Sequence, residues 1–185
     1  MNDTLKIIAD RFSCRGYDGR PVEKDKVDAI AKAALQAPSA MNLQPWEIIV
    51  ITDKGMIDEM DAVAMEDLAT RPDNAAYNRI MERGGKIFYN APCMFLVLKE
   101  TGPRWAELDC GIVTQNIALA ATSLGLDNII VAMAAIPLNG PKGDAFKQRL
   151  GGFAPGYEFG MSVCVGYGNV TKPPHEINPA KVKFI

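Results

Sequence analysis

Apolar positions recur at helical spacing in several stretches of the chain. The clearest case is residues 23–35, where the apolar side chains fall on one face. The run of residues 54–89 has a helical composition, but Arg71-Pro72 and Gly84-Gly85 interrupt it, which predicts two helices with an exposed connection that can act as a lid. Gly125 is placed to end the longest helix as a C-terminal cap. The predicted helices cover residues 3–12 (capped by Asp3), 23–35, 54–89 (two helices), 107–124 and 144–150.

Short β-branched or apolar runs between the helices predict four strands, at residues 46–52, 93–98, 128–136 and 161–167. These runs are apolar at consecutive positions, so both faces of the sheet are expected to be covered by helices. Two helices precede the first strand, which is unlike a plain doubly wound fold. The tail after Gly168 contains three prolines and has no core of its own, so we expect it to lie along another surface.

Length and composition limit the function classes. With 185 residues the chain fits a single domain over residues 1–185, and the net charge of -2 disfavours a binder of nucleic acid. None of the four cysteines forms a CxxC pair, and there is one histidine, so a zinc site is hard to build. We expect a reducing, cytoplasmic protein with no metal site, no secretory signal and no membrane partner.

Several common catalytic motifs are absent from the sequence. There is no GxGxxG after the first predicted strand and no GxxxxGK[ST], so neither a Rossmann site nor a P-loop is supported. A catalytic triad would have to use His175, which lies in the proline-rich tail. The cysteines are expected to pack in the core.

The first candidate site is the run RFSCR at residues 11–15. If this segment is extended, alternate side chains point the same way, and Arg11, Ser13 and Arg15 converge. Two guanidinium groups and a hydroxyl suit a phosphate dianion, because arginine binds phosphate oxygens in a bidentate, charge-assisted manner. The alternative is that both arginines are solvated near the C-terminus of a helix, where the helix dipole favours them.

The second candidate site is the loop APSAMNLQPW at residues 37–46. Ser39, Asn42 and Gln44 offer neutral donors and acceptors that can bind the polar edge of a heterocycle, and Ala37 and Ala40 leave room for a flat ring. The alternative is an ordinary helix-to-strand loop made of turn residues.

Three segments in this order and spacing resemble the FMN-dependent nitroreductase family: RFSCR, APSAMNLQPWEIIVI and DCGIVTQNIALAATSLGLDNIIVAM. The resemblance implies an α+β, three-layer α/β/α fold with a central mixed sheet. It also implies an intertwined homodimer that binds two FMN molecules at the subunit interface.

The resemblance also assigns roles to individual residues. The FMN phosphate and ribityl chain would be held by Arg11, Ser13 and Arg15, with Phe12 between them. The partner subunit would approach the same flavin with its loop, and the backbone of residues 131–133 would lie near the isoalloxazine. The implied contacts in these two segments are Pro38, Ser39, Ala40, Asn42, Val131, Ala132 and Met133. Lys172 is the candidate for closing the phosphate site, and Asn78 or Lys86 for a place near the pyrimidine ring.

The implied activity is an FMN-dependent oxidoreductase. Hydride would pass from NAD(P)H through the bound FMN to an electron-poor acceptor such as a nitroaromatic or a quinone, in a ping-pong scheme. Flavin carries the redox chemistry, so no catalytic side chain needs to stand out. The alternative is an FMN-binding protein without turnover, such as a flavin store, a sensor or a docking subunit.

Overall fold

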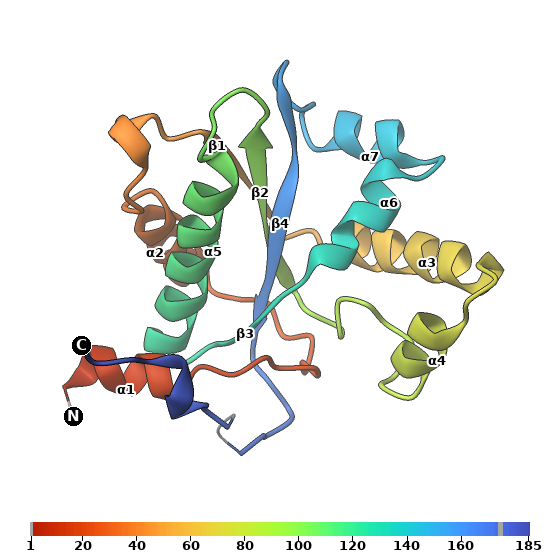
Figure 1. The fold of residues 1–185 in the computed structure, drawn as a ribbon. Coiled ribbons are helices and arrows are strands. Elements are labelled where there is room, and N and C mark those ends of the chain that lie inside the picture. Colours follow the sequence, from red (N-terminus) through yellow and green to blue (C-terminus); the bar gives the residue numbers. More distant parts are fainter. Residues whose placement is uncertain (1, 174–175) are drawn as a thin grey trace.

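A four-stranded sheet forms the middle layer of the molecule in the computed structural model, which describes residues 2–173 and 176–185 (Figure 1). Every neighbouring pair of strands is antiparallel. The order across the sheet is β1 (Trp46–Ile51), β2 (Cys93–Glu100), β4 (Tyr157–Gly166) and β3 (Asp127–Ile130).

Helices cover both faces of this sheet (Figure 1). One face carries α1 (Asp3–Asp10), α2 (Lys24–Ala34) and α5 (Ala106–Ser123), and the other carries α3 (Lys54–Thr70), α4 (Ala75–Met81), α6 (Ala135–Asn139) and α7 (Gly143–Arg149). Short 3₁₀ turns lie at Ala40–Asn42, Ala132–Ala134 and Pro179–Lys181.

Alternate residues of β2 contribute to two separate cores. Phe95 and Val97 pack in the cluster beneath α2 and α5, whereas Met94 and Leu96 pack in the cluster beneath α3. All of these side chains are buried, which explains the continuous apolar run in the sequence. The three-layer arrangement expected from the sequence is present.

Most of the predicted helices are confirmed. The interruption in residues 54–89 separates α3 from α4, and Gly125 follows α5 with a φ of +73°. The N-cap of α1 is Asn2, whose side chain accepts a hydrogen bond from the backbone N–H of Leu5, rather than the expected Asp3.

Two strand predictions need correction. The third strand ends at Ile130, and residues 132–139 are helical because Ala134 and Leu138 turn into the core. The fourth strand begins at Tyr157, earlier than expected, since Glu158 and Gly160 break the apolar run that marks it.

The expected mixed sheet is wrong for this chain. The named strands pair only antiparallel, and the one parallel contact among the described residues is an isolated bridge between Ser13 and Asn128. A long helical connection such as residues 52–92 can return the chain to either end of a strand, so the alternation of helices and strands did not determine their direction.

The tail leaves the sheet at Gly168, which forms an isolated bridge with Tyr17. All described residues after Gly168 are exposed, including the apolar Phe184 and Ile185. His175 lies outside the described residues. Within the described part of the chain, no helix is both long and apolar enough to cross a membrane.

Candidate functional site

Residues 11–15 form an extended segment beside the start of β3. The backbone N–H of Cys14 donates to the carbonyl of Asn128 at 3.0 Å. Phe12 packs against the core and Cys14 is fully buried, whereas Arg11, Ser13 and Arg15 are half-exposed. Cys14 is therefore the one fully buried residue of this segment, and the side chains of Arg11, Ser13 and Arg15 remain partly accessible.

The two arginines carry uncompensated charge. Among the described residues, neither Arg11 nor Arg15 has a carboxylate within 4.0 Å. Arg15 donates through Nη1 to the carbonyl of Ser13 at 3.3 Å, which holds its guanidinium close to that residue. Two cationic groups without a protein partner, next to a hydroxyl, can bind a phosphate.

The continuation of this segment is fixed on both sides. On one side, Tyr17 exchanges hydrogen bonds with Tyr89 and Asn90, which precede β2. On the other side, the backbone N–H of Asp18 donates to the carbonyl of Tyr167, and that of Asn169 donates to the carbonyl of Gly16, both at 3.0 Å. The segment that carries the arginines is therefore anchored between two other parts of the chain.

The loop after α2 has an unusual backbone. Met41, Asn42 and Gln44 have φ values of +53°, +54° and +49°. A left-handed conformation costs a non-glycine residue about 1 kcal/mol. Clusters of such residues occur at functional sites, where the surrounding structure enforces them. Met41 is also 85% exposed, so packing within this chain does not explain the conformation.

Two side chains hold the loop in this shape. Ser39 accepts the backbone N–H of Gln44 on its hydroxyl at 2.9 Å. Buried Asp109, in the first turn of α5, accepts the backbone N–H of Ala40 at 3.3 Å on both carboxylate oxygens. Asn42 accepts a weaker bond from the side chain of Gln44 at 3.4 Å, and it remains exposed.

Residues 131–133 follow β3 directly. Val131 is buried and paired with Ser162, whose carbonyl accepts its N–H at 2.8 Å and whose hydroxyl donates to its carbonyl at 2.5 Å. Ala132 is exposed and Met133 half-exposed. Since Ser13 pairs with Asn128, only three residues before Val131, the arginine segment and residues 131–133 lie about 10 Å apart along one strand.

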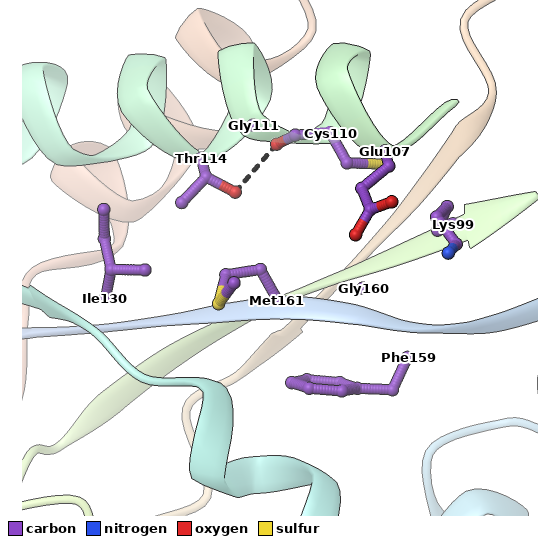
Figure 2. A pocket seen from close by; sticks show the side chains of 9 residues that line it. All are labelled: Lys99, Glu107, Cys110, Gly111, Thr114, Ile130, Phe159, Gly160 and Met161. Carbon is purple, nitrogen blue, oxygen red and sulfur yellow. Dashed lines mark hydrogen bonds between the residues drawn. The ribbon is translucent and has the colours of Figure 1, made fainter. Parts of the chain in front are cut away.

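A hollow of about 350 Å³ lies next to these residues, between α5 and β4 (Figure 2). Its walls include Cys110 and Thr114 from α5, Met161 from β4, and Ile130, which immediately precedes Val131. Burial raises the pKa of the Cys110 thiol to about 11, so this group is a neutral wall rather than a nucleophile. Ile130 lines the hollow, whereas residues 131–133 do not.

The loop and the arginine segment do not meet within one chain. The loop is bonded to Asp109 at the start of α5, whereas Asn128, beside Ser13, is bonded to Thr122 near the end of α5. Thirteen helical residues separate Asp109 from Thr122, which is about 20 Å. The two candidate sites therefore lie toward opposite ends of α5 (Figure 1).

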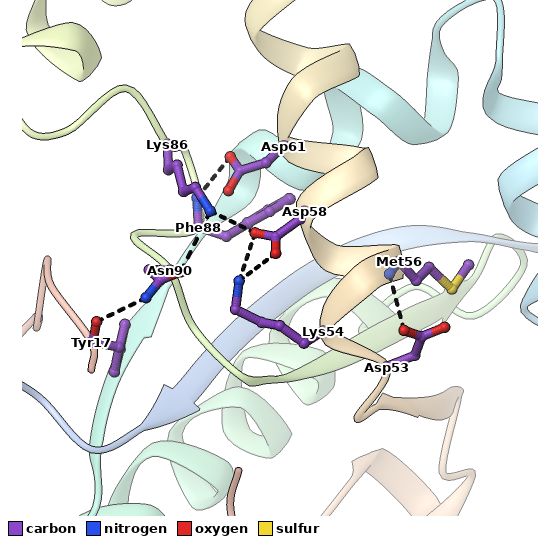
Figure 3. Close-up of polar contacts among 9 residues, drawn as sticks. All are labelled: Tyr17, Asp53, Lys54, Met56, Asp58, Asp61, Lys86, Phe88 and Asn90. Carbon is purple, nitrogen blue, oxygen red and sulfur yellow. Dashed lines mark hydrogen bonds and ion pairs between the residues drawn. The ribbon is translucent and has the colours of Figure 1, made fainter. Parts of the chain in front are cut away.

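The other candidates are placed as follows. Lys172 is exposed, and Asn78 is exposed on α4. Lys86 forms an ion pair with Asp58 at 2.7 Å (Figure 3), so its charge is already compensated. The places of Lys172, Asn78 and Lys86 in the structure do not test whether they contact a ligand.

Sequence reasoning missed two buried carboxylates. Asp109 shapes the loop, and Asp61 accepts backbone N–H groups of the turn before β2. Burial raises the pKa of Asp61 to about 6, although those N–H groups oppose the effect. An acidic residue on a helix is normally expected to be solvated, so the sequence pattern did not indicate that Asp61 and Asp109 are buried. All four thiols are buried, and the described residues contain no cluster of three metal-ligating side chains.

Comparison with known proteins identifies the family. A sequence profile of the Nitroreductase family matches residues 8–167. The chain belongs to the nitroreductase family. A solved nitroreductase with bound FMN from Desulfitobacterium hafniense is 46% identical, covers 100% of this chain and 99% of its own, and superposes with a TM-score of 0.94.

Two curated nitroreductase relatives are more distant. A protein of Archaeoglobus fulgidus, provisionally named NADH dehydrogenase/NAD(P)H nitroreductase, is 32% identical over 135 residues, which is 70% of this chain and 67% of the relative. The nitrobenzene nitroreductase of Ectopseudomonas oleovorans is 28% identical over 160 residues, which is 65% of this chain and 70% of the relative.

Proposed function

We propose that this protein is an FMN-dependent NAD(P)H oxidoreductase that reduces an electron-poor acceptor, such as a nitroaromatic or a quinone. The observation that carries the proposal is the pair of uncompensated arginines, Arg11 and Arg15, on an extended segment with Ser13. These side chains supply the positive charge and the hydrogen-bond donors that the phosphate of a flavin requires. Three similar proteins support this proposal. The solved nitroreductase at 46% identity contains FMN, and the names of two relatives include NAD(P)H and nitrobenzene.

The residues present fit FMN. Arg11, Ser13 and Arg15 would hold its phosphate and ribityl chain, and Phe12 between them anchors the segment in the core. The backbone of residues 131–133, which directly follows β3, would lie against the ring. Lys172, in the exposed tail, would close the phosphate site.

FMN, when bound, would supply the redox chemistry, which is two-electron transfer from NAD(P)H to the acceptor. The protein supplies position and environment. The arginines fix the phosphate end, so the ring is held without any catalytic side chain. The backbone N–H groups of Ala132 and Met133 would stabilise negative charge on the ring, whereas that of Val131 already donates to Ser162. Over both half-reactions, NAD(P)H, a proton and a quinone give NAD(P)⁺ and a hydroquinone.

A homodimer is part of the proposal. The loop of Pro38, Ser39, Ala40 and Asn42 is bonded near the start of α5, and the arginine segment lies beside its end, about 20 Å away along the helix. The loop would therefore contact the flavin of a second subunit. Exposed apolar side chains also need cover: Leu5 and Ile8 on α1, and Phe184 and Ile185 in the tail.

A hollow of about 360 Å³ at the edge strand β1 offers a place for the tail of the partner. It is lined by the apolar Leu35, Trp46, Ile48 and Val50. The described residues of the tail are all exposed and its end is apolar, so the tail fits such a hollow. Docked there, it would cover the exposed edge strand.

Steady-state kinetics test the activity. With the FMN-loaded protein, initial rates are measured while NADH or NADPH and 1,4-benzoquinone or nitrobenzene are varied together. A ping-pong reaction gives parallel double-reciprocal lines, since the donor leaves before the acceptor binds. Bound FMN without oxidation of either nucleotide would contradict the proposal and would favour a flavin store, a sensor or a docking subunit.

A further inference from the structure

We propose that Asp61 of α3 is a positioning residue for the flavin-binding segment of residues 11–17, and that it acts through the turn of residues 86–90. The inference rests on the proposed role of Arg11, Ser13 and Arg15 in holding FMN. Two consecutive contacts connect Asp61 to that segment (Figure 3), and a third fixes Tyr17 to β4.

The first contact joins α3 to the turn. Asp61 is 3% exposed, and its Oδ1 accepts the backbone N–H of Ile87 at 2.6 Å and that of Phe88 at 3.2 Å. One helical turn earlier, Asp58 accepts hydrogen bonds from Lys86 at 2.7 Å and from Lys54 at 2.6 Å. Two carboxylates on one face of α3 therefore fix both the backbone and the side chain at the start of the turn.

The second contact depends on the backbone of the turn. Tyr89 and Asn90 have φ values of +54° and +67°, a left-handed conformation that must be held by its surroundings. In this conformation the carbonyl of Tyr89 accepts the N–H of Tyr17 at 3.1 Å, and the side chain of Asn90 donates to the carbonyl of Tyr17 at 3.1 Å. Both backbone groups of Tyr17 are therefore bonded to the turn.

The third contact fixes the segment itself. Tyr17 is buried, and its hydroxyl donates to the carbonyl of Cys164 on β4 at 3.3 Å. Arg15 is only two residues away along an extended chain. If the turn relaxes, Tyr17 loses two of its three hydrogen bonds, and the segment that carries Arg15 keeps only the backbone bonds of Cys14, Gly16 and Asp18 to Asn128, Asn169 and Tyr167. Arg15 is then positioned less tightly relative to the phosphate.

The environment of Asp61 argues against a purely space-filling role. Its second oxygen, Oδ2, is buried without a hydrogen-bond partner, which is an expensive arrangement for a carboxyl group. An apolar side chain would fill the same space without that penalty. What an apolar side chain cannot do is accept the N–H groups of Ile87 and Phe88, which would then be buried without partners.

Titration of the FMN-free full-length protein with FMN tests the inference, using fluorescence quenching at constant salt. Asp61→Leu removes the acceptor, and Asp61→Asn keeps Oδ1. Met60→Ala is the matched control, since Met60 is also fully buried on α3 but bonds nothing in the turn. We expect affinity to fall about tenfold in Asp61→Leu and to stay within about threefold of wild type in Asp61→Asn and Met60→Ala.

Two further measurements keep the test decisive. Asn90→Gly keeps the left-handed backbone and removes the bond to Tyr17, so it should weaken FMN binding even if Asp61→Leu does not fold. Amide hydrogen exchange without FMN should rise in Asp61→Leu at residues 15–18 and 86–90 but not at β1.

Wild-type affinity in both Asp61→Leu and Asn90→Gly, or an equal loss in Met60→Ala, would overturn the positioning role. Failure of the proposed function is distinguishable, because wild-type protein would then not bind FMN or Arg15→Ala would bind it unchanged. The exchange measurement would still report whether Asp61 holds Tyr17.

Discussion

Replacing Asp61 by Asn should make the stability of the protein less dependent on pH. In the folded chain Asp61 is buried, and burial raises its pKa to about 6 from an ordinary value of 3.8. The backbone N–H groups of Phe88 and Ile87 and the positive charge of Lys86 oppose this rise, while the negative charge of Asp58 adds to it. Cys164 also lies close enough for its own pKa to be raised by Asp61, after the larger effect of burial.

The direction and size follow from proton linkage. A carboxyl group with a raised pKa in the folded state favours folding while it is protonated, and this contribution is lost as the pH rises through about 6. The difference between 6 and 3.8 corresponds to about 3 kcal/mol in the free energy of unfolding. About a third of it is already lost at pH 4.5. Asn cannot ionise, so the stability of Asp61→Asn relative to wild type should increase by about 2 kcal/mol between pH 4.5 and pH 7.5.

Urea denaturation of both FMN-free proteins at the two pH values, at equal protein concentration and ionic strength, measures this difference. Comparing the variant with wild type at each pH cancels the titration of all other groups. A difference that stays constant within about 0.5 kcal/mol would show that Asp61 titrates normally, and the account of its burial would be refuted.

Three other predictions concern the flavin site and the assembly. Arg11→Ala and Arg15→Ala should each weaken FMN binding about ten- to a hundredfold in a fluorescence titration, whereas the control Arg149→Ala, on helix α7, should not. Unchanged affinity in both Arg11→Ala and Arg15→Ala would remove these arginines from the site. Asn42→Asp should lower the midpoint potential of the flavin in an anaerobic dye titration, because an added negative charge disfavours the reduced ring; equal potentials would mean that Asn42 only shapes its loop. Sedimentation equilibrium should give a stable dimer at micromolar concentration, and deletion of the residues after Gly168 should release flavin; a mass of 20.1 kDa for the intact holoprotein would contradict the dimer.

Local patterns in the sequence predicted the helices and the chemistry of one site. Residues 23–35 and 107–124 carry enough apolar periodicity to define α2 and α5 within a residue or two. The alternation in RFSCR predicts that Arg11, Ser13 and Arg15 share one side; Cys14 is buried, whereas Phe12 is only partly buried, so the shared side stays a prediction. In these cases the information lies within one turn or one short strand.

Features that depend on distant contacts could not be predicted. The direction of the strands depends on how residues 52–92 return to the sheet. The left-handed backbone at Met41 and Asn42 could not be predicted, because no glycine marks it in the sequence. It is enforced by hydrogen bonds to Asp109 and Ser39. Asp61 resembles any acidic residue on a helix until the turn before β2 is placed against it.

The anaerobic visible spectrum of the purified protein, before and after NADH or NADPH is added, tests the central claim most directly. The account predicts a yellow protein with one FMN per chain, whose absorbance near 450 nm is bleached by a nucleotide and returns when a quinone is added. A colourless protein that takes up no FMN, or a yellow protein that no nucleotide reduces, would contradict it.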